Sequence, residues 1–256
     1  MIRVNNKLLM VEQAGDGEAI LMIHGLGGTA NAWYPQATVL AKYFHVIRPD
    51  MEGSGRTPVK GKISIASLTK DVIKLMDKMA IKTAHLAGHS MGTIVCQHLA
   101  ANYPKRVKSL ALLGPLAEPP VPARSAISAR AVIAREQGMA PIADSLVQAA
   151  ISQQSKASNN AIAAFVREII MAQGAEGYAR NCDALAAAKA ADLSKIRCRT
   201  LLVTGDEDGV APPPAVRKLS QQIKRSELII LSGCGHWTPI EKPTEVNEAF
   251  INFFVR

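Results

Sequence analysis

A serine flanked by glycines is the first residue in the sequence whose type and setting suggest chemistry. Residues 88–92 read Gly-His-Ser-Met-Gly and lie between a predicted strand and a predicted helix. A turn this tight needs small residues on both sides, and it holds the serine hydroxyl at the carboxyl end of the strand. The pentapeptide alone also occurs in ordinary Gly-Ser turns, but its strand–turn–helix context predicts that Ser90 is a nucleophile.

A serine hydroxyl is a weak nucleophile near neutral pH, so it needs a base to accept its proton. If the chain order is serine, acid and then histidine, the base lies downstream. Residues 233–236 read Gly-Cys-Gly-His and follow the last predicted strand, at the sheet edge where reactive groups gather. The other histidines fall in predicted strands, a helix or beside glycine turns, where a structural role is expected. We therefore predict His236 as the base.

The acid that orients this histidine is expected at the end of the preceding strand. Three carboxylates follow that strand, namely Asp206, Glu207 and Asp208. A carboxylate there fixes the imidazole tautomer and stabilises the imidazolium. Spacing alone does not choose among the three.

The negative charge that develops on an acyl oxygen needs two backbone N–H donors. One donor is expected from Met91, the residue after the nucleophile, and the other from a loop after an early strand. Residues 24–28 read His-Gly-Leu-Gly-Gly, which makes Leu26 the expected second donor. A dinucleotide-binding loop is the rival interpretation, but the last glycine of its G-x-G-x-x-G pattern is missing.

Alternating strands and helices are predicted to position these groups. Predicted strands cover residues 8–11, 20–23, 45–47, 85–87, 107–113, 200–204 and 227–231. Predicted helices cover residues 30–43, 67–79, 91–102, 214–223 and 244–254. This alternation is typical of an α/β fold, with a mostly parallel central sheet flanked by helices on both faces.

The pattern changes between about residues 116 and 193, where prolines precede Ala-rich helical stretches without a clear strand. One amphipathic helix there is indicated by the 3.6-residue period of Ile162, Phe165, Val166, Ile169 and Ile170. We expect one domain over residues 1–256, with a helical lid over about 116–193 inserted between two strands.

Composition excludes several classes of partner. The net charge of +9 is scattered in basic pairs without a long run or interleaved aromatic residues, which argues against nucleic-acid binding. The four cysteines form no C-x-x-C pair, and their spacing fits no zinc site. We expect the protein to need neither a metal nor an organic cofactor. With no apolar N-terminal segment and no run of membrane-spanning length, we expect a cytoplasmic protein without a membrane partner.

With these residues placed, the chain from about residue 20 onward resembles the α/β-hydrolase superfamily. Within it, the chain is similar to β-ketoadipate (3-oxoadipate) enol-lactone hydrolases and related small carboxylesterases. The similar stretches are residues 24–28, 33–36, 50–57 and 88–92, and in the lid 138–144 and 176–182. The family pattern Gly-x-x-Asp-x-x-x-Pro falls on Gly205, Asp208 and Pro212, so the resemblance selects Asp208 as the acid.

The resemblance implies an α/β-hydrolase fold and a serine hydrolase that cleaves a small carboxylic ester or enol-lactone through an acyl-enzyme. It also suggests Trp33 as a substrate-binding residue. An enol-lactone of this type bears a carboxylate, which is costly to desolvate unless it is paired. Among the lid arginines, Arg130 is the candidate partner, although all of them could be solvated surface charges.

The chain also departs from the family pattern, at Glu52, Ser54 and Thr93, where members often carry Arg, His and Gly. These departures leave the Ser-Asp-His pattern intact but weaken the case for the enol-lactone itself. A broad-specificity carboxylesterase is the nearest alternative. A lyase or a signalling receptor that reuses the same residues stays open, because fold does not settle function.

Overall fold

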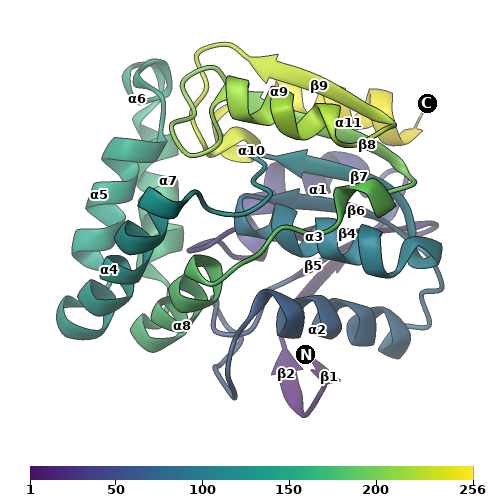
Figure 1. Cartoon of the computed structure of the whole chain (residues 1–256), viewed down its shortest axis with the longest axis horizontal. Coiled ribbons are helices and arrows are strands. Elements are labelled where there is room, and N and C mark those ends of the chain that lie inside the picture. Colours follow the sequence, from purple (N-terminus) through teal and green to yellow (C-terminus); the bar gives the residue numbers. More distant parts are fainter. Residues whose placement is uncertain (256) are drawn as a thin grey trace.

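The alternating apolar runs form a central sheet, which we describe from a computed structural model that covers residues 1–255 (Figure 1). The strand order is β3-β5-β4-β6-β7-β8-β9. These strands are β3 (Val11–Ala14), β4 (Ala19–Ile23), β5 (His45–Pro49), β6 (Ala84–His89), β7 (Val107–Leu113), β8 (Arg199–Gly205) and β9 (Ser226–Leu231). β3 runs antiparallel to β5 and the other pairs are parallel, which confirms the mostly parallel sheet.

Both faces of the sheet are covered, so its central strands are apolar on both sides. All five residues of β4 are buried, as expected of a parallel strand between two helical layers. Ile20 and Met22 face one core cluster, whereas Leu21 and Ile23 face the other. This division follows from the two-residue period of side chains along a strand.

Helices from distant parts of the chain form the two layers. One face packs against α1 (Tyr34–Leu40), α11 (Pro243–Phe250) and the π-helical turn that follows it (Ile251–Val255). The other face packs against α2 (Ile65–Lys78), α3 (Met91–Asn102) and α9 (Pro213–Gln221). Among residues 1–255, no helix is both long and apolar enough to span a lipid bilayer.

The segment between β7 and β8 is helical, as the sequence predicted. It contains α4 (Val121–Gln137), α5 (Ala140–Ala150), α6 (Gln153–Ser158), α7 (Asn160–Met171) and α8 (Ala175–Ala186). These helices gather at the left of Figure 1, beyond the carboxyl ends of the strands. We call them the lid. In α7, Val166, Ile169 and Ile170 are buried, which agrees with the apolar period read from the sequence.

Two predicted elements are wrong in detail. The strand predicted over 8–11 divides at Met10, because β2 (Lys7–Leu9) pairs with β1 (Ile2–Val4) in a separate hairpin while β3 joins the main sheet. The helix predicted over 30–43 is a 3₁₀ turn, Ala30–Trp33, followed by α1. Pro35 explains this break, since a proline lacks the N–H that a continuous helix needs but is well tolerated in a first turn.

Glu52, one of the departures from the family pattern, fastens the N-terminal hairpin to the domain. The Lys7 Nζ lies 2.5 Å from the Glu52 Oε2 and 2.7 Å from the Asp71 Oδ2. Both carboxylates are buried. Burial favours the uncharged forms of these side chains. Pairing with the two carboxylates nevertheless raises the pKa of Lys7, and the contacts of Glu52 with Lys7 lower the pKa of Glu52. The ion pair therefore stays charged near neutral pH.

Candidate active site

Ser90 lies at a sharp turn between β6 and α3. Its backbone has φ 51° and ψ −121°, a conformation that costs energy for any residue other than glycine. The turn brings the chain so close to β4 that a Cβ on Gly92 would lie 2.3 Å from the Ile23 carbonyl oxygen. This close approach explains why the sequence has glycine at position 92.

Three loops at the carboxyl ends of strands bring Ser90, Asp208 and His236 together. Ser90 follows β6, Asp208 follows β8 and His236 follows β9. The His236 Nε2 lies 2.8 Å from the Ser90 Oγ, and its Nδ1 lies 2.9 Å from the Asp208 Oδ2. Because a carboxylate accepts hydrogen bonds, Nδ1 carries the proton and Nε2 is free to accept the serine proton.

Asp208 is the carboxylate that reaches the imidazole, whereas Asp206 and Glu207 do not. The Asp208 Oδ1 accepts hydrogen bonds of 2.8 Å from both Val210 N–H and Ala211 N–H. Burial alone would raise the pKa of Asp208, but the charge and hydrogen bond of His236, together with these N–H groups, hold it below its ordinary value. Asp206 is exposed and accepts from Cys234 N–H instead, while Glu207 accepts from Gln153 N–H.

Glu241 holds the loop that carries His236, a contact that the sequence did not predict. Its carboxylate is buried and accepts 2.9 Å hydrogen bonds from Gly235 N–H and Trp237 N–H, on either side of His236. The same carboxylate accepts from Ser152 N–H of the lid.

His89, the residue before Ser90, supports the same loop. Its Nε2 lies 2.8 Å from the His236 carbonyl oxygen, which can only accept, so Nε2 carries the proton. Burial, and then the nearby His236, lower the pKa of His89 to about 3. His89 is therefore neutral near pH 7 and acts as a hydrogen-bond donor to the backbone of His236.

The loop after β4 passes directly over Ser90. A Cβ on Gly25 would lie 2.7 Å from the Ser90 Cβ. Gly28 N–H donates to the Gly25 carbonyl at 3.0 Å and closes a four-residue turn, in which Gly27 has φ 75°. Within residues 1–255, Leu26 N–H makes no hydrogen bond to the protein. Met91 N–H is likewise free, as expected for the first residue of a helix.

His24 fixes the direction in which the Leu26 N–H points. The His24 Nε2 accepts from Met51 N–H at 3.0 Å, so Nδ1 carries the proton and donates to the Gly25 carbonyl at 2.8 Å. That carbonyl and the Leu26 N–H belong to one planar peptide unit. Burial lowers the pKa of His24 and keeps the ring neutral, which preserves both hydrogen bonds.

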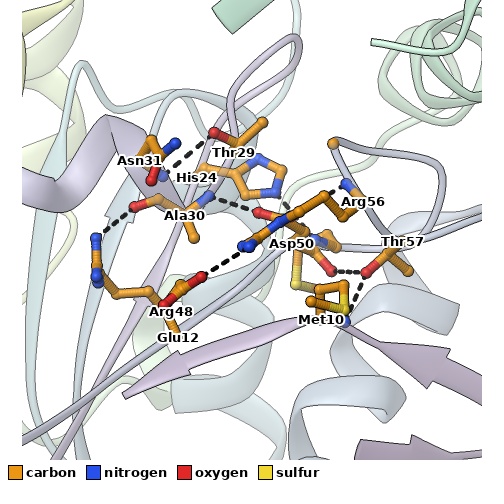
Figure 2. Close-up of polar contacts among 12 residues, drawn as sticks. Met10, Glu12, His24, Thr29, Ala30, Asn31, Arg48, Asp50, Arg56 and Thr57 are labelled. Carbon is orange, nitrogen blue, oxygen red and sulfur yellow. Dashed lines mark hydrogen bonds and ion pairs between the residues drawn. The ribbon is translucent and has the colours of Figure 1, made fainter. Parts of the chain in front are cut away.

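A buried aspartate joins the loops after β4 and β5 (Figure 2). The Asp50 Oδ1 accepts from Ala30 N–H at 2.7 Å, and its Oδ2 accepts from Arg56 N–H at 3.1 Å and from Arg56 Nε at 3.0 Å. Arg48 donates to the Ala30 carbonyl, and Thr57 donates to the Asp50 carbonyl. These bonds account for several of the residues in the stretch 50–57.

A cavity of about 450 Å³ lies between Ser90 and the lid. Its lining is mostly apolar and consists of Leu26, Ser90, Leu116, Pro119, Pro120, Ala123, Ala126, Ile127, Arg130, Ser145, Leu146, Ala150, Leu185, Gly209, Val210, His236 and Trp237. Arg130 supplies the positive charge in this lining. Within residues 1–255 its guanidinium forms no ion pair.

The other lid arginines are occupied elsewhere. Arg124 donates to the carbonyls of Ala186 and Ala188, while Arg135, Arg167 and Arg180 pair with carboxylates on the lid surface.

Trp33 requires a correction, because the structure does not place it in the cavity. Its side chain is fully buried in the core under α11. The indole stacks on Phe250, with ring centroids 6.3 Å apart, and contacts His89 edge-on, with ring centroids 6.5 Å apart. A large aromatic residue near the loop after β4 looks the same in sequence whether it faces a substrate or the core. Only the packing of α1 and α11 shows that Trp33 faces the core and not the cavity.

The cysteines offer neither a second nucleophile nor a metal site. Cys96, Cys182, Cys198 and Cys234 are free thiols. Burial raises the pKa of each of them, that of Cys182 to about 11. Such thiols are protonated near neutral pH and therefore unreactive. No group of three His, Cys, Asp or Glu side chains within residues 1–255 is arranged to hold a metal ion.

Known proteins match this chain in sequence. Residues 18–133 match the family model described as alpha/beta hydrolase fold. The 3-oxoadipate enol-lactonase 2 of Acinetobacter baylyi is 30% identical over 91% of this chain and 87% of its own length. The (E)-2-((N-methylformamido)methylene)succinate hydrolase of the same species is 28% identical over 96% of this chain and 93% of its own.

A solved structure gives the same result. The enol-lactonase from Burkholderia xenovorans LB400 superposes with a TM-score of 0.94 at 30% sequence identity, and covers 100% of this chain and 99% of its own. These relatives are hydrolases, whereas the sequence alone left a lyase or a receptor open. The chain belongs to the α/β-hydrolase family, and it is a hydrolase.

Proposed function

We propose that this protein is a serine hydrolase that cleaves a small carboxylic ester or lactone through an acyl-enzyme. The observation that carries this proposal is the continuous line of hydrogen bonds from Ser90 through His236 to Asp208. Ser90 is the nucleophile, His236 the general base and acid, and Asp208 the group that orients and stabilises the imidazolium. The backbone N–H groups of Leu26 and Met91 form the oxyanion hole.

In the first half of the reaction, the Ser90 Oγ attacks the acyl carbon while its proton passes to the His236 Nε2. The carbonyl oxygen becomes negatively charged and accepts hydrogen bonds from the two backbone N–H groups. The intermediate then collapses, and His236 returns the proton to the leaving oxygen. An acyl group remains on Ser90, and in a lactone the leaving oxygen stays attached to that acyl group.

In the second half, a water molecule takes the place of the leaving group. His236 removes a proton from this water as it attacks the acyl-enzyme. The second tetrahedral intermediate uses the same oxyanion hole, and its collapse releases the acid and regenerates the Ser90 hydroxyl. Every proton in this cycle passes through one nitrogen, the His236 Nε2.

We further propose that the substrate carries a carboxylate that binds Arg130. A carboxylate in a mostly apolar cavity is costly to desolvate unless a cation pairs with it. Arg130 offers a charged, planar donor without an ion-pair partner among residues 1–255. The relatives named for 3-oxoadipate and for a succinate derivative support this proposal, since both names denote dicarboxylic acids. A carboxylesterase for neutral esters is a second candidate function, and the mostly apolar lining of the cavity is the observation that supports it.

A cytoplasmic location also belongs to this proposal. It is supported by the four free cysteines, which are typical of a reducing compartment.

Replacing the nucleophile tests the proposal first. We expect Ser90→Ala to lower kcat for p-nitrophenyl acetate by about a thousandfold or more, since only binding and the oxyanion hole remain. Ser128→Ala, which changes an exposed lid serine, is the matched control and should retain the wild-type kcat. A correctly folded Ser90→Ala protein with near wild-type turnover would refute the assignment.

The two aspartates after β8 provide a second test. Asp208→Asn removes the acceptor that fixes the His236 tautomer, so kcat should fall by roughly a hundred- to ten-thousandfold. Asp206→Asn changes a neighbouring exposed carboxylate and should stay within about threefold of wild type, as surface changes usually do. Initial rates at saturating ester decide between them. A larger loss in Asp206→Asn would transfer the role to that residue.

The anionic-substrate proposal predicts a change in preference. Arg130→Leu keeps an apolar side chain but removes the charge, and a hydrogen bond to a charged group contributes about 1.5–3 kcal/mol. We therefore expect kcat/KM for a carboxylate-bearing aryl ester to fall about 10- to 100-fold, with little change for its neutral methyl ester. Arg167→Leu, on the lid surface, is the control. An unchanged ratio in Arg130→Leu would favour the general carboxylesterase.

A further inference from the structure

Gln173, in the short segment between α7 and α8, joins the lid to two loops beneath it. Its carboxamide is buried, with only 6% of the residue exposed. The Nε2 donates to the carbonyls of Ile169 at 2.9 Å, Gly27 at 3.2 Å and Gly28 at 3.4 Å. The Oε1 accepts from Gly55 N–H at 3.1 Å. One side chain thus bonds to three separate stretches of backbone.

Two of these contacts fall on the turn that presents Leu26 N–H. The first half of the turn is held by His24, which donates to the Gly25 carbonyl. The second half, Gly27 and Gly28, consists of residues with little intrinsic preference for one conformation. The Gln173 amide holds the carbonyls of this second half.

Packing limits the same turn from the lid side. A Cβ on Gly27 would lie 3.3 Å from the Tyr178 ring, so the turn and α8 are in close contact. Tyr178 is fully buried. If the segment between α7 and α8 moved, the hydrogen bonds of Gln173 and the contact between Gly27 and Tyr178 would be lost together.

We propose that Gln173 is a positioning residue for the oxyanion hole. Through its hydrogen bonds, the position of the lid determines the position of Leu26 N–H. This inference rests on the proposed acyl-enzyme reaction. The donor must lie about 2.7–3.1 Å from the oxygen that becomes charged in the transition state. A displacement of about 1 Å costs on the order of a hundredfold in rate. Gln173 therefore affects kcat more than substrate binding.

Asn181 supplies a matched comparison for a role that is only structural. It is also a buried carboxamide of the lid, and its Nδ2 donates at 2.9 Å to the carbonyls of Glu52 and Gly177. It fastens α8 to the loop after β5 but makes no hydrogen bond to the turn 25–28. Loss of Asn181 weakens lid attachment without releasing the oxyanion loop.

The experiment compares Gln173→Leu and Gln173→Glu with Asn181→Leu and Asn181→Asp. Each protein is assayed for kcat and KM with p-nitrophenyl acetate, for stability in urea and for binding of an aryl trifluoromethyl ketone. Ser90 adds to that ketone to form a hemiketal whose negatively charged oxygen occupies the oxyanion hole. Binding of the ketone therefore reports on the hole independently of turnover.

For the Gln173 variants, we expect kcat to fall about 10- to 100-fold and ketone affinity to weaken by a similar factor, with KM changed less than about threefold. The Asn181 variants should be destabilised to a similar degree but keep kcat and ketone affinity within about threefold of wild type. Gln173→Asn, which shortens the carboxamide by one methylene, provides a milder variant if the others fail to fold. This variant should lose kcat and ketone affinity by similar factors, each smaller than in Gln173→Leu.

Equal losses of kcat in the Gln173 and Asn181 variants would overturn the inference, as would a Gln173 effect confined to stability or KM. Such a result leaves the proposed function intact, because wild type would still turn over the ester and bind the ketone. If wild type did neither, the proposed function itself would fail, and this inference with it.

Discussion

The His236 imidazole contacts two partners at once, and distant parts of the chain hold it in that position. Its Nδ1 has to face Asp208 while its Nε2 faces Ser90, and these three residues lie far apart in the sequence. A parallel sheet meets this demand because the carboxyl ends of β6, β8 and β9 lie along one edge. The loop that carries His236 is fixed by Glu241 and His89, whose side chains form hydrogen bonds with the backbone of residues 235–237.

The loop that carries Leu26 is held in a different way, because side chains satisfy its buried backbone groups. His24 holds the first half of the turn, and Asp50 ties the neighbouring loops together. Leu26 N–H and Met91 N–H have no hydrogen-bond acceptor within the described residues. Met91 follows Ser90 directly, and Leu26 lies with Ser90 in the lining of the cavity. Because His24 holds the Gly25 carbonyl, the Leu26 N–H of the same planar peptide unit has a fixed direction before a substrate arrives, as electrostatic stabilisation requires.

Local signals in the sequence accounted for some of these features and not for others. Ser90 and His236 could be found because a tight turn and the chain order constrain them within a few residues. Asp208 was separated from Asp206 only by a family pattern, since the choice depends on which carboxylate turns inward. The placement of Trp33 was wrong for a similar reason, because core and cavity lie on opposite sides of one loop. Gln173 was missed, since its contacts join positions 146 residues apart and have no local pattern.

We expect Ser90 to form a covalent bond during the reaction, and intact-mass spectrometry with a fluorophosphonate detects such a bond. The serine oxygen attacks phosphorus and fluoride leaves, which adds one phosphonyl group to the protein. We expect one adduct per chain, mapped by peptide sequencing to Ser90, with loss of ester hydrolysis in proportion to labelling. Ser90→Ala protein should stay unlabelled. Labelling on another residue, or full hydrolysis by a fully labelled protein, would show that Ser90 is not the nucleophile.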